Sequence, residues 1–234
     1  MHAYSGQPLT GGTPEVMWKT DGAWNTLPMT QVSGDDYVAF IPPQVSGTLV
    51  QYFVHAEDGS GRSENHPYIG AGDPHAFLAS PGTTYCFGDG SGTACPCGNA
   101  GGQGRGCASG ASEVGAALLC EGSASVGADD LVLNANFAAP GQPGLFFQGD
   151  DAIAGGSGAT FGDGLRCAGT NVVRLEVAMA DSGGNASSSV PVAATGGVTA
   201  GDVERYQFWY RDPQQSPCGS GFNLTNGLEL VWAP

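Results

Sequence analysis

The feature that most restricts how this chain can fold is a cluster of cysteines near its middle. Four of the seven cysteines, Cys86, Cys95, Cys97 and Cys107, fall within one glycine-rich stretch. Zinc sites use paired Cys-x2-Cys or Cys/His spacings, and neither these spacings nor any histidine occurs in the stretch. The cluster therefore favours disulfides over zinc. Disulfides predict an oxidising compartment, so we expect the protein to be extracellular or on the cell surface.

Glycine and proline restrict the secondary structure. With 40 glycines and 15 prolines, the chain has few stretches that could sustain a long helix, because both residues break helix interiors. Its apolar residues come instead in short alternating runs between turn signals, which is typical of an all-β protein. No apolar run approaches the roughly 20 residues of a membrane helix, and no signal peptide is recognisable. We therefore expect a mature secreted fragment.

Three runs show the strand pattern most clearly. Residues 48–57 are apolar on both faces, which predicts a central strand, and a turn at 58–61 and a polar loop are expected to follow it. Tyr206, Phe208 and Tyr210 share one face of another strand, and Trp209 points to the opposite face. A third strand is predicted to bring four apolar residues onto a single face: Val173, Leu175, Val177 and Met179.

Composition divides the chain into an extended arm (1–14), a front module (15–80) and a cysteine-containing module (81–234). In the front module, the residues at 18–22, 27–29, 37–42 and 52–61 resemble a partial fibronectin-III-like module. Such modules are commonly appended to secreted bacterial peptidases and surface proteins. They normally begin with two further strands, for which the arm offers little material. The resemblance therefore implies an incomplete fibronectin-III/Ig-like sandwich with an open sheet edge.

The cysteine-containing module carries more specific motifs, in which cysteines and aromatic residues stand beside Gly-Asp-Gly turns. They lie at 85–90, 95–99, 106–107, 144–149, 161–167, 206–213, 218–219 and 221–227. The region 85–234 resembles a cysteine-containing C-terminal β module of large secreted or surface proteins of environmental, high-GC bacteria. That family is not known to be catalytic. The seven or eight short strands expected here, one of them at 189–194, predict a disulfide-stapled β-sandwich or jelly roll.

Six cysteines are disulfide candidates, because Cys120 lies outside these motifs and is the odd one of the seven. Sequence alone leaves the pairing open. We favour a bridge between Cys167 and Cys218, with the others inside or beside the 86–107 cluster. The six candidates are Cys86, Cys95, Cys97, Cys107, Cys167 and Cys218.

The sequence predicts that the protein is not an enzyme. Neither G-x-S-x-G nor H-E-x-x-H occurs, and no histidine lies in the cysteine-containing module. His66 and His75 stand near Glu64 and Asp73 and offer a candidate metal group, although solvated loop histidines are the favoured interpretation. The acidic doublets of the chain do not predict a glycosidase, since neighbouring strand residues point to opposite faces.

Calcium is the one cofactor that the sequence suggests. Asp and Gly recur together in predicted loops, where carboxylates and converging carbonyls supply the oxygen ligands that calcium prefers. The alternative is that Asp-Gly simply makes turns, and no EF-hand motif is present. The candidate ligands are Asp89, Asp129, Asp130, Asp150, Asp151 and Asp163.

A binding surface is suggested by Trp209. If the strand face that carries it is open to solvent, Trp209 would form a sugar-stacking platform with Arg205, Gln207 and Arg211. The favoured alternative is that Trp209 packs between two sheets.

The net charge of the chain restricts the classes of partner that it can bind. The chain carries 22 acidic and 7 basic residues, a net charge of −15, which argues against nucleic acid and anionic membranes. We expect a non-catalytic extracellular structural module for surface attachment or self-assembly. Its partners would be further copies or other extracellular proteins, joined by β-strand addition at the open edge into a filament or lattice. The alternative is a carbohydrate-binding or substrate-targeting appendage of a larger secreted enzyme such as a peptidase.

Overall fold

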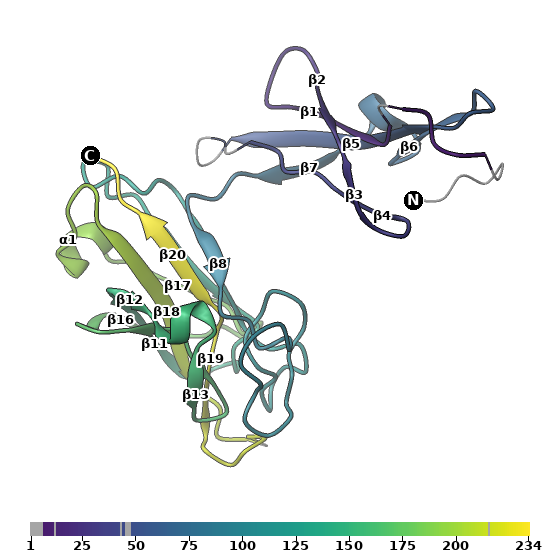
Figure 1. Cartoon of the computed structure of the whole chain (residues 1–234). Coiled ribbons are helices and arrows are strands. Elements are labelled where there is room, and N and C mark those ends of the chain that lie inside the picture. Colours follow the sequence, from purple (N-terminus) through teal and green to yellow (C-terminus); the bar gives the residue numbers. More distant parts are fainter. Residues whose placement is uncertain (1–6, 12, 43, 45–47, 215) are drawn as a thin grey trace. The chain divides into compact units, whose positions relative to one another are not determined.

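The fold was analysed in a computed structural model, which describes all residues except 1–6, 12, 43, 45–47 and 215. The chain separates into two compact units, Met1–Ala79 (unit 1) and Ser80–Pro234 (unit 2). The regular secondary structure of both is almost entirely β-strand, which confirms the predicted all-β class (Figure 1). Within the described part of the chain, no helix is long and apolar enough to cross a membrane.

Unit 1 is organised around one long strand, β5 (Leu49–Glu57). On one side β5 pairs with β1 (Glu15–Lys19), which in turn pairs with β2 (Asn25–Pro28). On its other side, the first half of β5 pairs with β7 and the second half with β6. The remaining elements of the unit are β3 (Thr30–Ser33), β4 (Asp36–Val38), β6 (Ser63–His66), the short helix η1 (Gly70–Gly72) and β7 (His75–Leu78).

Two parts of unit 1 differ from the sequence-based prediction. Residues 63–66 form a strand where a polar loop was expected, because the nine-residue β5 extends far enough to pair with them. The described part of the arm is not free either. Leu9 bridges to Asp58, and the amide of Thr10 donates to the carbonyl of Glu57 at 2.8 Å, so the arm lies against its own β5.

Unit 1 has a thin core. Among its described residues, the buried apolar side chains are those of Val16, Val50 and Phe53. A group of large apolar side chains is exposed instead: Val32, Phe40, Leu49, Tyr68, Ile69 and Phe77. Little apolar surface is therefore removed from water within this unit.

Unit 2 contains two main sheets. The larger has the order β16-β11-β18-β20-β8, with β19 also paired to β18, and the smaller has the order β17-β10-β9. The larger sheet comprises β8 (Thr83–Tyr85), β11 (Pro143–Gly149), β16 (Val173–Met179), β18 (Val203–Arg211), β19 (Phe222–Leu224) and β20 (Gly227–Val231). The smaller comprises β9 (Ala117–Glu121), β10 (Val132–Asn136) and β17 (Ala186–Ser187).

The main core of unit 2 lies between these sheets. The smaller sheet contributes Leu118 and Leu133, which are completely buried. The larger sheet contributes aromatic side chains from alternate positions of β18 and its neighbours: Phe146, Tyr206, Phe208 and Tyr210. Because successive strand residues point to opposite faces, the residues between them lie on the outer face of the larger sheet.

An excursion between β11 and β16 covers part of that outer face. It consists of two small antiparallel pairs, β12 with β15 and β13 with β14. Their bounds are β12 (Asp151–Ala152), η2 (Ile153–Gly156), β13 (Ala159–Phe161), β14 (Gly164–Arg166) and β15 (Ala168–Gly169).

One predicted strand is a helix. Residues 189–194 were expected to be extended, but Val192–Gly196 forms the short helix α1. Two amides of its first turn, those of Ala193 and Ala194, donate to the carboxylate of Asp129 at 2.8 and 3.0 Å. The helix ends before Gly197, which has a φ of +70°. A carboxylate at an N-terminus and a left-handed glycine at a C-terminus both stabilise a helix. The capping group is 63 positions away from Val192 in the sequence, so local patterning did not reveal it.

The disulfide pairing also corrects the prediction. The bridges are Cys86–Cys167, Cys95–Cys107 and Cys97–Cys218, and Cys120 is a buried free thiol. The expected bridge between Cys167 and Cys218 is therefore wrong. Cys86 follows β8, whose Tyr85 donates a hydrogen bond to the Cys167 carbonyl at 3.2 Å, so the ends of these segments meet although 81 positions separate the two cysteines.

Candidate functional site

A groove crosses the outer face of the larger sheet in unit 2. Its floor is a row of side chains that lie side by side on four adjacent strands. Leu145 of β11 is paired with Val177 of β16 and with Trp209 of β18, and Trp209 is paired with Leu224 of β19. The strand order thus gathers four apolar residues that are far apart in the sequence into one continuous strip.

The β13–β14 hairpin and β19 supply further aromatic residues. The ring of Phe222 lies 5.6 Å from that of Trp209 and 5.1 Å from that of Phe161, measured between centroids. The resulting groove has a volume of about 500 Å³, within the range of small-ligand sites. We call it the aromatic groove; it is lined by Pro143, Gly144, Leu145, Phe147, Phe161, Arg166, Val172, Arg174, Val177, Trp209, Phe222 and Leu224.

Gly162 allows Phe222 to pack against the turn of the β13–β14 hairpin. It occupies the turn between β13 and β14 with φ +62°, a conformation that side-chain-bearing residues rarely adopt. The edge of the Phe222 ring lies so close that an added Cβ would be 2.2 Å from it. A glycine is therefore required both by the turn and by the contact with Phe222.

A bulge in the sheet determines which side chains of β16 face the groove. The pairing of β11 with β16 shifts between Phe146 and Phe147, so that Phe146 faces Glu176 and Phe147 faces Arg174. Leu175 therefore points into the core, whereas Val177 and Met179 are 69% and 61% exposed on the outer side. The prediction that Val177 and Met179 share a face with Leu175 is wrong, because a bulge reverses the alternation beyond it.

Arginine side chains stand around the groove. Arg166 and Arg174 line it, and the guanidinium of Arg211 lies 5.5 Å from the centre of the Trp209 ring. Arg166 donates to the Ala168 carbonyl at 3.2 Å. The side chain of Arg174 is exposed and has no hydrogen-bond or ion-pair partner among the described residues. No lining residue is acidic, although the chain has 22 acidic residues.

The structure divides the four predicted ligand-binding residues into two pairs. Trp209 is half-buried in the groove, and Arg211 lies at its edge. Gln207 is completely buried beneath the excursion. Its amide accepts from the Cys167 amide at 2.9 Å and donates to the carbonyls of Leu165 and Thr225 at 2.8 and 2.7 Å. Gln207 therefore fastens the excursion to the sheet and is not available to a ligand.

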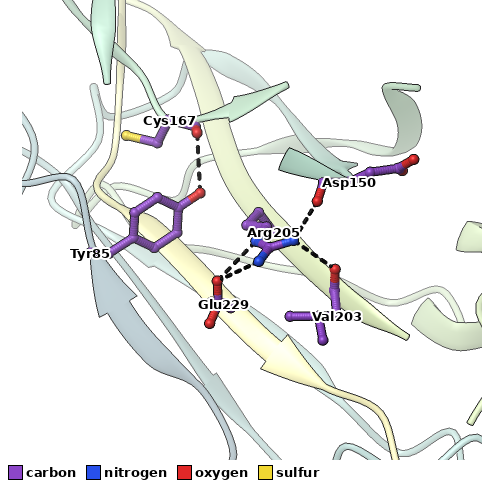
Figure 2. A network of polar contacts seen from close by, with 6 residues as sticks. All are labelled: Tyr85, Asp150, Cys167, Val203, Arg205 and Glu229. Carbon is purple, nitrogen blue, oxygen red and sulfur yellow. Dashed lines mark hydrogen bonds and ion pairs between the residues drawn. The ribbon is translucent and has the colours of Figure 1, made fainter. Parts of the chain in front are cut away.

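Arg205 is also occupied within the protein (Figure 2). Its guanidinium forms an ion pair with Glu229 at 2.8 Å and donates to the carbonyls of Asp150 and Val203. Tyr85 lies beside this network with its hydroxyl on the Cys167 carbonyl, and burial raises the pKa of Tyr85. These contacts of Arg205 join β18, β20 and the start of the excursion, so Arg205 has a structural role.

The candidate calcium ligands do not converge. Asp89 and Asp130 accept hydrogen bonds from Ser91 and Ser123 in separate turns, and Asp129 caps α1. The carboxylate of Asp150 accepts from Asn171 at 2.7 Å, and Asp151 is exposed on β12. Throughout the described chain, no three His, Cys, Asp or Glu side chains gather as a metal-binding group, and this includes His66, His75, Glu64 and Asp73. Calcium binding stays a prediction.

Asp163 differs from the other candidate calcium ligands because its side chain is completely buried. Its carboxylate accepts from the hydroxyl of Ser216 and from the amides of Cys218 and Ser220 at 3.2 and 3.1 Å. Burial by itself would raise the pKa of Asp163, but these hydrogen bonds hold the pKa below its usual value. The residue therefore organises the loop before β19 as a buried anion.

The residues that sequence reasoning missed are those contributed by neighbouring strands and by the hairpin. Phe161, Arg166 and Phe222 all lie in motifs of the resemblance, but nothing in their spacing shows that the hairpin folds over the outer face. Strand alternation places Arg174 on the face opposite Val177, and only the bulge brings both to the groove, with Val177 paired to Leu145 and Arg174 paired to Phe147.

Comparisons with known proteins identify no family for this chain. No family model matches it, and no curated protein matches it. One solved structure, described as a "tetra-tandem repeat in extending region of large adhesion protein", aligns with 94% of this chain and 43% of its own length, at 11% identity and a TM-score of 0.30. The chain thus spans less than half of that neighbour. Likeness at this level supports neither a fold assignment nor a function.

Proposed function

We propose that this protein is a non-catalytic extracellular attachment module, and that the aromatic groove holds a carbohydrate chain. The observation that carries the proposal is the strip of Val177, Leu145, Trp209 and Leu224, which continues across four strands and lines the groove. Val177 is exposed, Leu145 and Trp209 are half-buried, and Leu224 is buried at the end of the strip. A folded protein rarely leaves an aromatic groove uncovered unless something binds there.

The groove fits a sugar better than a peptide. Its lining comes from a sheet face, where the backbone hydrogen bonds are already made between strands. An extended peptide laid on this face would lose hydration of its amides without gaining partners, which is costly. A sugar ring presents a face of C–H groups to an aromatic side chain and keeps its hydroxyls at the rim. Trp209 and Phe222 supply such aromatic surfaces.

Nothing in the groove provides reaction chemistry. Its polar side chains are those of arginines, which at neutral pH cannot act as general bases. The proposed role is therefore retention at a surface. The three disulfides of unit 2 support an extracellular setting for such a role.

Binding to immobilised polysaccharides tests the proposal. The intact chain should be retained on a polysaccharide column, and Trp209→Ala should abolish the retention because it removes the centre of the strip. Tyr68→Ala is the matched control, since Tyr68 is an exposed aromatic residue of unit 1, outside the groove. Equal retention of the Trp209 variant and the unchanged chain would refute a role for the groove.

A second candidate function is self-assembly through unit 1. The specific observation is the imbalance between three buried apolar side chains and six exposed ones in its described part. A second copy of the chain would cover such surface by strand addition or face packing. Exchange of the N-terminal arm is disfavoured, because Leu9 and Thr10 are bound to their own unit. A single monomeric peak in size-exclusion chromatography with light scattering, up to high concentration, would rule out this function.

A further inference from the structure

The charges around the aromatic groove are opposite to those of the rest of the chain. Of the seven basic residues, three stand at the groove: Arg166, Arg174 and Arg211. The lining contains no Asp or Glu, in a chain whose net charge is −15. The groove therefore concentrates positive charge at a place where composition alone would put negative charge.

The other arginines of unit 2 are used within the fold. Arg205 is neutralised by Glu229, and the guanidinium of Arg105 packs 4.2 Å from the ring of Phe137. The groove arginines have no carboxylate partner among the described residues, and Glu176, which lies on the same strand as Arg174, is turned to Ser189. Arg174 therefore has all its donors available to a ligand.

We infer that the ligand of the aromatic groove is an anionic polysaccharide, whose ring faces stack on Trp209 and Phe222 while its acidic groups pair with the arginines. This inference rests on the proposed function and specifies its ligand class. Guanidinium groups bind carboxylates and sulfates through paired, parallel hydrogen bonds, and a neutral sugar offers no such partner.

The acidity of the whole chain does not prevent this binding. Charges beyond about 8 Å are largely screened at physiological ionic strength, whereas contacts inside the groove are not. Nucleic acid is also anionic, but its charge lies on closely spaced phosphates along an extended backbone, which the net charge of −15 on the chain would repel. A polysaccharide with one acid group per ring matches a few arginines set around an apolar strip.

The test compares one sugar chain with and without its charges. Polygalacturonate and its fully methyl-esterified form have the same backbone, and only the first is anionic. In calorimetric titrations of the full chain at 150 mM salt, polygalacturonate should bind at least about tenfold more tightly than the ester, because each lost ion pair of about 1 kcal/mol is about fivefold in affinity.

Two variants locate the effect. Arg174→Ala should weaken polygalacturonate binding about fivefold and leave binding of the ester unchanged. The side chain of Arg174 has no partner in the described part of the chain, so the variant should fold normally. Arg62→Ala removes an equal charge from unit 1 and should change neither affinity. Dextran sulfate carries sulfates in place of carboxylates on a different sugar backbone, and Arg174-dependent binding to it would show that the groove accepts sulfate as well.

The possible results distinguish failure of the anionic ligand from failure of carbohydrate binding as such. Equal affinity for acid and ester, lost in Trp209→Ala, would overturn the anionic ligand and leave the groove as a neutral-sugar site. Tighter binding to polyglutamate than to polygalacturonate would overturn the polysaccharide in favour of an acidic peptide. Binding to none of these polysaccharides would overturn both the inference and the proposed function.

Discussion

At the scale of single residues, the side chains that matter most are buried polar ones that satisfy several partners. Gln207 contacts three backbone groups of the excursion and of the β19–β20 connection. Replacing it by alanine would leave those buried groups without hydrogen bonds, which costs about 1–3 kcal/mol for each unsatisfied group. We therefore predict that Gln207→Ala lowers the free energy of unfolding of unit 2 by about 3 kcal/mol in urea titrations.

Gln214 provides the control for that prediction. It is exposed, and its side chain has no partner among the described residues. Gln214→Ala should change the free energy of unfolding by less than about 0.5 kcal/mol. Equal small losses in the two variants would show that Gln207 does not hold the excursion.

Asp163 leads to a prediction about acid stability. Its pKa in the folded state is lower than the ordinary aspartate value of 3.8, so its contribution to stability is complete above that value. The contribution is lost as the pH falls through the lower, folded pKa. Below that pH, Asp163 is protonated in both the folded and the unfolded state, so its charge no longer stabilises the fold. The stability difference between the unchanged chain and Asp163→Asn should therefore be largest above about pH 5 and shrink toward pH 2. A difference independent of pH would contradict this role.

At the scale of elements, the groove depends on how a hairpin and a bulge are placed against the sheet. Gly162 lets Phe222 pack against the β13–β14 turn. Any larger residue at this position would collide with the Phe222 ring and would also have to adopt the unfavourable φ of +62°. We predict that Gly162→Ala displaces Phe222, alters the fluorescence of the adjacent Trp209 and destabilises unit 2 by more than the roughly 1 kcal/mol expected from the backbone conformation alone.

Gly141 serves as a control that separates the cost of the backbone conformation from the cost of the collision with Phe222. It has φ +68°, but an added Cβ would meet nothing within 4 Å. Gly141→Ala should therefore show only the backbone cost and leave the fluorescence of Trp209 unchanged. If the two variants behave alike, the contact between Gly162 and Phe222 is not what shapes the groove.

The elements also show what the sequence can reveal. The alternation of Tyr206, Phe208 and Tyr210 depends only on strand geometry, and the structure places all three in the core. The register of Val177 and Met179 depends on a bulge opposite Phe146, and the helix α1 depends on a carboxylate from a distant turn. Such features are set by contacts between segments that are far apart in the sequence, so local patterns did not predict them.

At the scale of the whole molecule, the two units differ in how they are stabilised. All seven cysteines lie in unit 2, where three disulfides supplement a two-sheet core. Each bridge is expected to contribute about 2–4 kcal/mol by restricting the unfolded chain. We predict that reductant lowers the unfolding temperature of unit 2 in calorimetry and leaves that of unit 1 unchanged. A single transition that shifts as one would show that the units do not unfold independently.

The central claim, that the aromatic groove binds an acidic polysaccharide chain through Trp209, is tested most directly by the indole N–H signals of the four tryptophans in nuclear magnetic resonance. Trp232 is buried and donates to the Tyr206 hydroxyl at 2.9 Å, and Trp18 and Trp24 belong to unit 1, so these three serve as internal references. On titration with oligogalacturonate, we predict that the Trp209 signal shifts in a saturable way while the other three stay in place. A stationary Trp209 signal, or a shift of Trp18 or Trp24 in its stead, would contradict the account.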